Sequence, residues 1–265
     1  NIEAWNIAAR LSLKDSTDDV LLKEAIGQEI HSGYEHIFTL LSLAYDAQTI
    51  SHVRQNIESE SAESTGYAME LLELVVSEDI KPTLFPLIDD SSDSEKVKVL
   101  QNFFPVDRIP LNELLTDIVN RDCNQLNAWT KASALFYILK LENFLVSDDL
   151  VAQMFNPNEL ISELAALIVH KNAPERIENY YKRIDEKNRI RLNTSIKNYI
   201  SEPEHLIINK MLYLKELDFL KSVPTDRLYY LAQHLEIEKY EDGADIEGVD
   251  EDFEVKVYML VEGKV

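Results

Sequence analysis

The sequence predicts an all-α fold, arranged as an α-solenoid, with a short and incomplete β-segment at its C-terminal end. Apolar residues recur at helical spacing through most of the first 220 positions, as at Ile37, Leu40, Leu41, Ala44 and Tyr45. Glycine is scarce, with six in 265 residues, and three of the six lie at or after Gly243. This shift in composition predicts two domains, a helical-repeat domain over 1–215 and a different structure over 216–265.

The helical part is predicted to form successive helix pairs, each of roughly 30 to 40 residues. In the stretch 60–90, an Ala/Leu-rich helix is followed by a Ser-Glu-Asp turn and a second helix with Pro82 near its start. Pro86 lies deeper and is expected to bend or shorten that second helix. Comparable pairs are expected over 18–58, 120–156 and 157–186.

A pair of this size cannot bury its apolar face alone, and stacking of neighbouring pairs solves the problem. The 60–90 unit resembles a HEAT repeat, and the other units resemble it more loosely. The resemblance implies an armadillo-like solenoid that offers a concave surface to partners. A non-repetitive helical bundle is the alternative that the periodicity leaves open.

Composition and charge restrict the function. The net charge of -22, from 48 acidic and 26 basic residues, disfavours nucleic acid and anionic membranes and favours basic partners. The single cysteine, Cys123, excludes an intrachain disulfide and fits a reducing, cytoplasmic compartment. No signal peptide and no apolar stretch of roughly 20 residues is present, so no membrane span is expected in this chain. Because it begins with Asn1, we expect a piece of a longer protein.

The C-terminal segment predicts a short helix opened by Pro224, followed by strands. In residues 257–265, VYMLVEGKV, the side chains Val257, Met259 and Val261 alternate with Tyr258 and Leu260, and a hairpin turn is expected at Gly263. Eight carboxylates over 241–254 are interpreted as a solvated acidic loop and not as a metal site. The β-segment resembles the opening of a cyclic-nucleotide-binding domain of the catabolite-activator type, over about 45 residues. The residues that match are Tyr240, Gly243, Ile246, Tyr258, Leu260, Gly263 and Val265.

That family holds its ligand with a later Gly-Glu pair, a short helix and an arginine, which do not occur before Val265. The resemblance therefore implies a truncated β-roll, and no cofactor or ligand contact is assigned to this chain. A cyclic nucleotide is expected to bind only if the missing cassette is restored.

Helical repeats before such a domain resemble the C-terminal region of bacterial transporters related to the ATP/ADP translocases. This resemblance implies a non-catalytic regulatory or scaffolding module that binds a protein partner or its own membrane domain, tethered at the inner membrane in the full-length protein. The alternative is a cytoplasmic signalling protein in which a cyclic-nucleotide domain controls the solenoid. An enzyme that uses the helices as a scaffold is a third hypothesis.

One basic cluster is the candidate site for a partner, whether an acidic protein, a lipid head group or RNA. Its members are Lys182, Arg183, Lys187, Arg189 and Arg191. Because Asp185 and Glu186 are interleaved with these cations, an exposed face joined by salt bridges is the alternative interpretation.

Other polar groups are interpreted structurally, and no catalytic or metal-binding residue is assigned. His31 and His36 are five residues apart, and a helix junction at Gly33 is expected between them. Residues 89–95 lack the glycine and the final glutamate of a calcium loop, so Ser92 or Asp93 is expected to cap the next helix. Cys123 has no obvious base partner, and the two tryptophans, Trp5 and Trp129, are expected in the core.

We predict that this chain has no measurable affinity for cyclic AMP or cyclic GMP in titration calorimetry. A cyclic phosphate needs convergent backbone N–H groups and a guanidinium, which the sequence up to Val265 does not supply. Saturable micromolar binding would contradict this interpretation.

Overall fold

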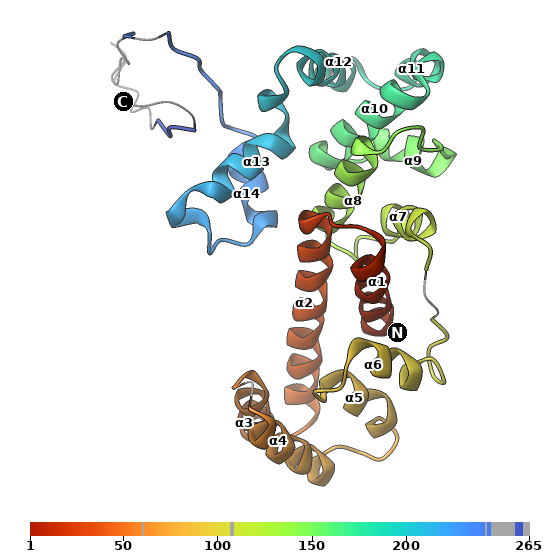
Figure 1. The fold of residues 1–265 in the computed structure, drawn as a ribbon, viewed down its shortest axis with the longest axis vertical. Coiled ribbons are helices and arrows are strands. Elements are labelled where there is room, and N and C mark those ends of the chain that lie inside the picture. The colour runs from red at the N-terminus through yellow and green to blue at the C-terminus, as the bar shows by residue number, and fades with distance from the viewer. Residues whose placement is uncertain (60, 107–108, 242, 245–257, 262–265) are drawn as a thin grey trace. The chain divides into compact units, whose positions relative to one another are not determined.

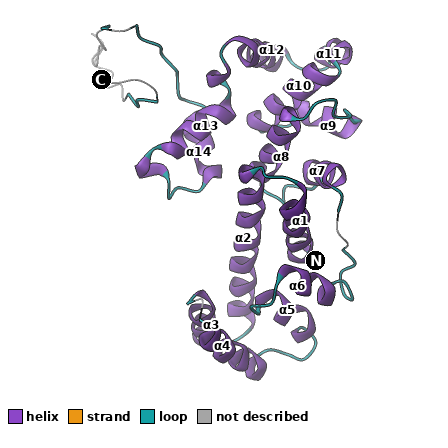
Figure 2. Cartoon of the chain, in the orientation of Figure 1, coloured by secondary structure: helices purple, strands orange, loops and turns teal. Residues whose placement is uncertain are grey.

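The computed structural model describes residues 1–59, 61–106, 109–241, 243–244 and 258–261, and every regular element among them is a helix (Figures 1 and 2). This confirms the predicted all-α class. The chain divides into two compact units, Asn1–Gln153 and Met154–Val265. The division falls inside the predicted 1–215 domain, and the boundary at 215 stays a prediction.

The first unit contains nine helices among its described residues. They are α1 Ile2–Ser16, α2 Val20–Ala44, α3 Ala47–Glu58, α4 Ala62–Val75, α5 Lys81–Ile88, α6 Asp93–Leu100, α7 Leu111–Asn120, α8 Ala128–Lys140 and α9 Asp148–Ala152. The helices expected within 18–58 and 60–90 are present as α2, α3, α4 and α5. Helix α2 packs on α3, whereas α4 packs mainly on α3 and α5 packs on α6, so α4 and α5 do not form the expected packed pair. As expected, Pro82 lies at the start of α5, and that helix is only eight residues long.

The core of the first unit forms around α1 and α2, which lie side by side (Figure 1). Helix α1 also packs on α6 and α7, while α2 packs on α3 and α8. Their inward side chains, such as Ile7, Leu13, Leu22 and Ile26, are fully buried. At about 25 cal/mol per Å² of apolar surface, this shared burial is the main stabilising contribution to the unit. The first two helices are thereby fixed to helices about 100 residues later.

Helix α2 is continuous through Gly33, so the expected helix junction at that residue is wrong. A Cβ at Gly33 would lie 1.9 Å from Oε1 of Glu3. The glycine therefore provides space for the Glu3 side chain of α1 and does not end the helix. A glycine costs about 1 kcal/mol in a helix interior, which the close approach of α1 and α2 offsets.

A buried carboxylate joins α2 to the start of α8. Glu29 of α2 accepts hydrogen bonds from the Asn127 N–H at 2.8 Å and the Thr130 hydroxyl at 2.6 Å. Asn127 is the N-cap of α8, and its side chain accepts from the Thr130 N–H. Glu29 therefore adds negative charge at a helix N-terminus, where the helix dipole favours it.

A second polar contact fixes α1 to α7. The Trp5 indole N–H donates to Asp117 at 2.8 Å, and Asp117 accepts from Arg121 at 3.0 Å. The Arg121 guanidinium lies 3.6 Å from the centroid of the Trp5 ring, a cation–π contact. Trp5 and Trp129 are both buried, which confirms their predicted place in the core.

The second unit contains five α-helices among its described residues. They are α10 Glu159–Asn172, α11 Pro174–Tyr181, α12 Glu186–Ser201, α13 Ile207–Glu216 and α14 Thr225–Ala232. Helix α10 is buried from Leu160 to Val169 and packs on α11 and α12, while α13 packs on α14. A helix that is buried all round lies at the centre of its domain, and α10 has this position.

The predicted C-terminal helix and β-segment have different outcomes. Helix α14 begins directly after Pro224, as predicted. Residues 258–261 carry no strand, and the remainder of the expected hairpin lies outside the described residues. The truncated β-roll over 216–265 therefore stays a prediction.

We predict that Glu29→Ala lowers the free energy of unfolding of the first unit by about 2–4 kcal/mol. The substitution leaves the Asn127 N–H without an acceptor, removes the shorter of the two hydrogen bonds donated by the Thr130 hydroxyl, and opens a cavity. Urea denaturation followed by circular dichroism measures the loss.

The matched control is Glu24→Ala on the exposed side of the same helix. We expect it to change the free energy of unfolding by less than about 0.5 kcal/mol. Equal effects of the two substitutions would contradict the capping role of Glu29.

Candidate functional site

The basic cluster predicted from the sequence lies around the turn between α11 and α12. Lys182 and Arg183 follow the last residue of α11, and Lys187, Arg189 and Arg191 lie in the first two turns of α12. Between the two groups, Asp185 caps α12 by accepting from the Asn188 N–H at 3.0 Å. The five cations therefore lie on the two sides of one turn, between the end of α11 and the second turn of α12.

The structure separates one of these five cations from the other four. Lys182, Arg183, Lys187 and Arg189 are exposed, and within the described part of the chain no salt bridge joins them to a carboxylate. Asp185 is engaged as an N-cap and does not neutralise them. We call these four residues the basic patch.

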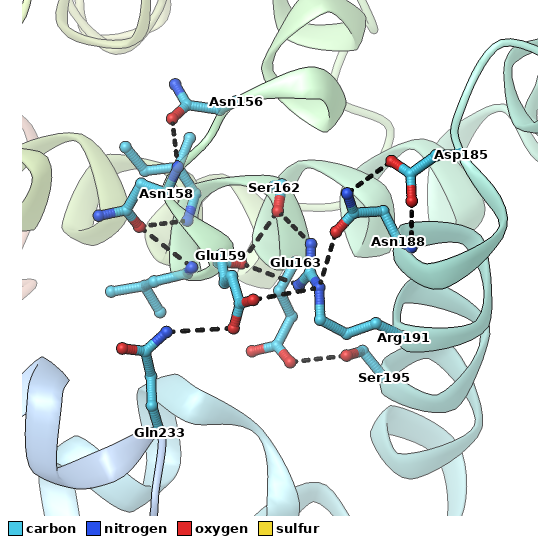
Figure 3. Close-up of polar contacts among 12 residues, drawn as sticks. Asn156, Asn158, Glu159, Ser162, Glu163, Asp185, Asn188, Arg191, Ser195 and Gln233 are labelled. Carbon is cyan, nitrogen blue, oxygen red and sulfur yellow. Dashed lines mark hydrogen bonds and ion pairs between the residues drawn. The ribbon is translucent and has the colours of Figure 1, made fainter.

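Arg191 is turned toward α10 and has a structural role (Figure 3). Its guanidinium donates to the Ser162 hydroxyl at 2.8 Å and the Glu159 carbonyl at 3.4 Å, and it lies 3.9 Å from the Glu159 carboxylate. It also donates to Asn188 at 3.4 Å. These contacts fix the first turns of α12 against α10 and leave the basic patch facing solvent.

Glu163 of α10 is the buried counterpart of Glu29 in this unit. It is 3% exposed and accepts from the Ser195 hydroxyl at 2.7 Å and the Ile207 N–H at 3.0 Å. Leu206, the N-cap of α13, has no side-chain acceptor for this helix start, so Glu163 provides one. Burial raises the pKa of Glu163, while the hydrogen bonds from Ser195 and Ile207 oppose the shift.

The N-terminus of α10 connects to α14 through a further set of hydrogen bonds (Figure 3). Asn158 caps α10 by accepting from the Leu160 and Ile161 N–H groups. Gln233 donates to Glu159 at 3.1 Å and to the Tyr229 hydroxyl at 2.8 Å. The polar groups of this network are hydrogen-bonded to one another, and their role is to position α12 and α14 on α10.

Sequence reasoning missed Glu29 and Glu163. Each is an acidic residue in line with buried apolar residues of its helix: Glu29 lies three and four residues after Ile26 and Ala25, and Glu163 lies within LISELAAL. A carboxylate at such a position requires buried donors, and this signal could have identified both. The distant helix that provides the donors could not be identified from spacing.

The remaining candidates have structural roles or are exposed. Ser92 forms a capping box with Glu95, which confirms the predicted helix cap. Asp93 forms a salt bridge with Arg10, with one hydrogen bond of 2.7 Å. His31, His36 and Cys123 are exposed. Within the described ranges, no three His, Cys, Asp or Glu side chains are grouped so as to hold a metal ion.

The Glu3 carboxyl of α1 has a raised pKa. Burial raises its pKa from 4.5 to about 7, and a 3.4 Å hydrogen bond from Asn6 partly opposes the shift. The charge of the nearby Glu29 raises the pKa further. The Glu3 carboxylate of α1 lies directly against Gly33 of α2. Protonation of Glu3 therefore changes the charge at the contact between these two helices.

Comparison with known proteins identifies no relative of this chain. No family model matches the chain, and no curated protein or solved structure matches it. Among the helices in the described part of the chain, none is both long and apolar enough to cross a membrane.

We predict that Glu3→Gln reduces the pH dependence of stability between about pH 4.5 and pH 7. A carboxyl with a raised pKa in the folded state stabilises the fold below its unfolded-state pKa, and that contribution is lost as the pH rises through about 7. Above pH 7 the variant should therefore be more stable than the parent, by on the order of 1 kcal/mol after allowance for partial exposure.

Melting temperatures measured at pH 4.5 and pH 8 test this expectation, with Glu24→Gln as the exposed control. A difference between Glu3→Gln and the parent that is the same at both pH values would count against the raised pKa.

Proposed function

We propose that this chain is a non-catalytic interaction module whose basic patch receives an acidic segment of a protein partner. The observation that carries the proposal is the exposure of four cations, Lys182, Arg183, Lys187 and Arg189, in a chain of net charge -22. A local cationic surface attracts an anionic segment, whereas the acidic remainder of this chain repels the other parts of an acidic partner. Charge then determines the orientation of binding as well as its rate.

The position of Lys187 supports a binding role. It lies in the first turn of α12, where the helix dipole disfavours a cation by a few tenths of a kcal/mol or more. Its ammonium has no carboxylate partner among the described residues that would offset this cost. An acidic ligand at the patch would supply the missing partner and would also interact favourably with the helix start.

The helix pairs support a scaffolding role for the module. Helices α2, α3 and α4 pack in sequence order, as neighbouring layers of the proposed solenoid would. The contacts of α1 with α6 and α7, and of α2 with α8, join distant parts of the chain. We therefore propose a short stack at α2–α4 attached to a more closed helical bundle.

On the resemblance to the transporters related to ATP/ADP translocases, we propose that the module regulates or anchors a membrane domain encoded on the same chain. The acidic surface outside the basic patch suits basic cytoplasmic loops of such a domain. The full-length gene tests this context. A segment of about twelve apolar helices before Asn1 would support the transporter, and its absence would exclude it.

We predict that Lys182→Glu with Arg183→Glu weakens binding of a fluorescein-labelled peptide of consecutive glutamates by about ten-fold or more. Fluorescence anisotropy at low salt measures the affinity, and added salt should weaken the binding of the parent protein. The charge-matched control is Lys14→Glu with Lys98→Glu, at two exposed lysines of the first unit. The proposal fails if both double variants bind like the parent, or if the parent does not bind the peptide.

A further inference from the structure

Helix α4 presents an outward face on which acidic and apolar residues alternate. Its inner side buries Ala68 and Leu72. The outward residues Glu63, Tyr67, Glu70 and Leu74 follow the spacing i, i+4, i+7, i+11, which places them along one side of a helix. Tyr67 is 54% and Leu74 is 82% exposed.

The two glutamates of this α4 face are not engaged elsewhere. The salt bridges formed by the acidic residues nearby use Glu58, Glu73 and Glu78, and no hydrogen bond or salt bridge joins Glu63 or Glu70 to another described residue. A face that combines two exposed apolar side chains with two unpaired carboxylates suits a ligand that is both apolar and cationic.

Helix α12 presents a face of the opposite charge. Lys187, Ile190, Thr194 and Lys197 follow the spacing i, i+3, i+7, i+10 and are all exposed, and Ile200 lies beside them. Ile190 is 59% and Ile200 is 72% exposed. Within the described ranges neither lysine forms a salt bridge. The buried side of the same helix carries Leu192 and Ser195.

We propose that the α4 face of one copy of this chain docks on the α12 face of a second copy. Each face carries two like charges and two large apolar side chains, and the charges of the two faces are opposite in sign. At about 1.5 Å per residue, the glutamates are about 10 Å apart and the lysines about 15 Å apart. The length and flexibility of a lysine side chain can accommodate this difference.

The contact is heterologous, because different surfaces of the two copies meet. Two copies joined by one such contact leave one α4 face and one α12 face free, so further copies add until a ring closes, or an open chain grows if the rotation does not close. One helix face on another is smaller than a standard interface, and weak association with a Kd on the order of 10–100 μM is expected. The inference rests partly on the proposed function, since Lys187 belongs both to the basic patch and to this face.

Two charge-reversed variants test the contact. Glu63→Lys with Glu70→Lys makes both faces basic, and Lys187→Glu with Lys197→Glu makes both acidic. Each variant alone should lose self-association, whereas an equimolar mixture should regain it, because the basic faces of one variant meet the acidic faces of the other. Sedimentation velocity over about 5–300 μM, a range that brackets the expected Kd, measures the weight-average sedimentation coefficient.

The expected result is a concentration-dependent sedimentation coefficient for the parent, its loss in each variant, and its recovery in the mixture. Glu175→Lys with Glu178→Lys, at exposed positions of α11, is the charge-matched control and should associate like the parent. Circular dichroism confirms that the variants remain folded.

A parent protein that stays monomeric over the whole range overturns the proposal, as does a mixture that remains monomeric. The binding of the glutamate peptide to the parent and to the Lys182 and Arg183 variant tests the proposed function independently of self-association. Peptide binding without self-association would exclude only the second copy as the occupant of the face.

Discussion

In each unit, a buried glutamate on a central helix provides the acceptor at the N-terminus of another helix. Glu29 of α2 accepts from the first residues of α8, and Glu163 of α10 accepts from the first residue of α13 and from Ser195 of α12. A buried carboxylate without donors is strongly destabilising, whereas one that accepts two hydrogen bonds and faces the positive end of a helix dipole is tolerated. The burial of each carboxylate therefore depends on the correct arrangement of its neighbouring helices. This dependence gives the packing a specificity that apolar contacts alone do not provide.

The same constraint determines what the second unit exposes. Helix α12 is attached to α10 by Ser195 on Glu163 and by Arg191 on Ser162 and Glu159. These contacts use the inward side of α12 and direct Lys187 and Arg189 outward. Because the attachment is made by hydrogen bonds and charge, the orientation of α12 about its own axis is determined more closely than apolar packing would determine it. The exposure of the proposed partner surface is thus a consequence of the hydrogen bonds and the ion pair that attach α12 to α10.

Local features of this fold could be predicted from the sequence, and long-range ones could not. The individual helices within 18–58 and 60–90, the Ser92 cap and the start of α14 after Pro224 depend on residues within a few positions of one another, whereas the packing of α4 on α3 and not on α5 does not. The helix junction at Gly33 was wrong because the reason for that glycine is Glu3, thirty positions away in the sequence. The basic cluster was found by composition, but charge spacing could not show that Arg191 is turned toward α10. The partners of Glu29 and Glu163 depend on tertiary packing, which periodicity does not encode.

Native-state hydrogen exchange at the Asn127 and Ile207 amides tests the central claim most directly. Both N–H groups lie at helix starts, where amides ordinarily lack an acceptor and exchange rapidly. If Glu29 and Glu163 hold them, each should exchange only when its unit opens, with a protection free energy close to that of the core amides of α2 and α10. Exchange of both amides at the rate of an exposed helix N-terminus would contradict the account.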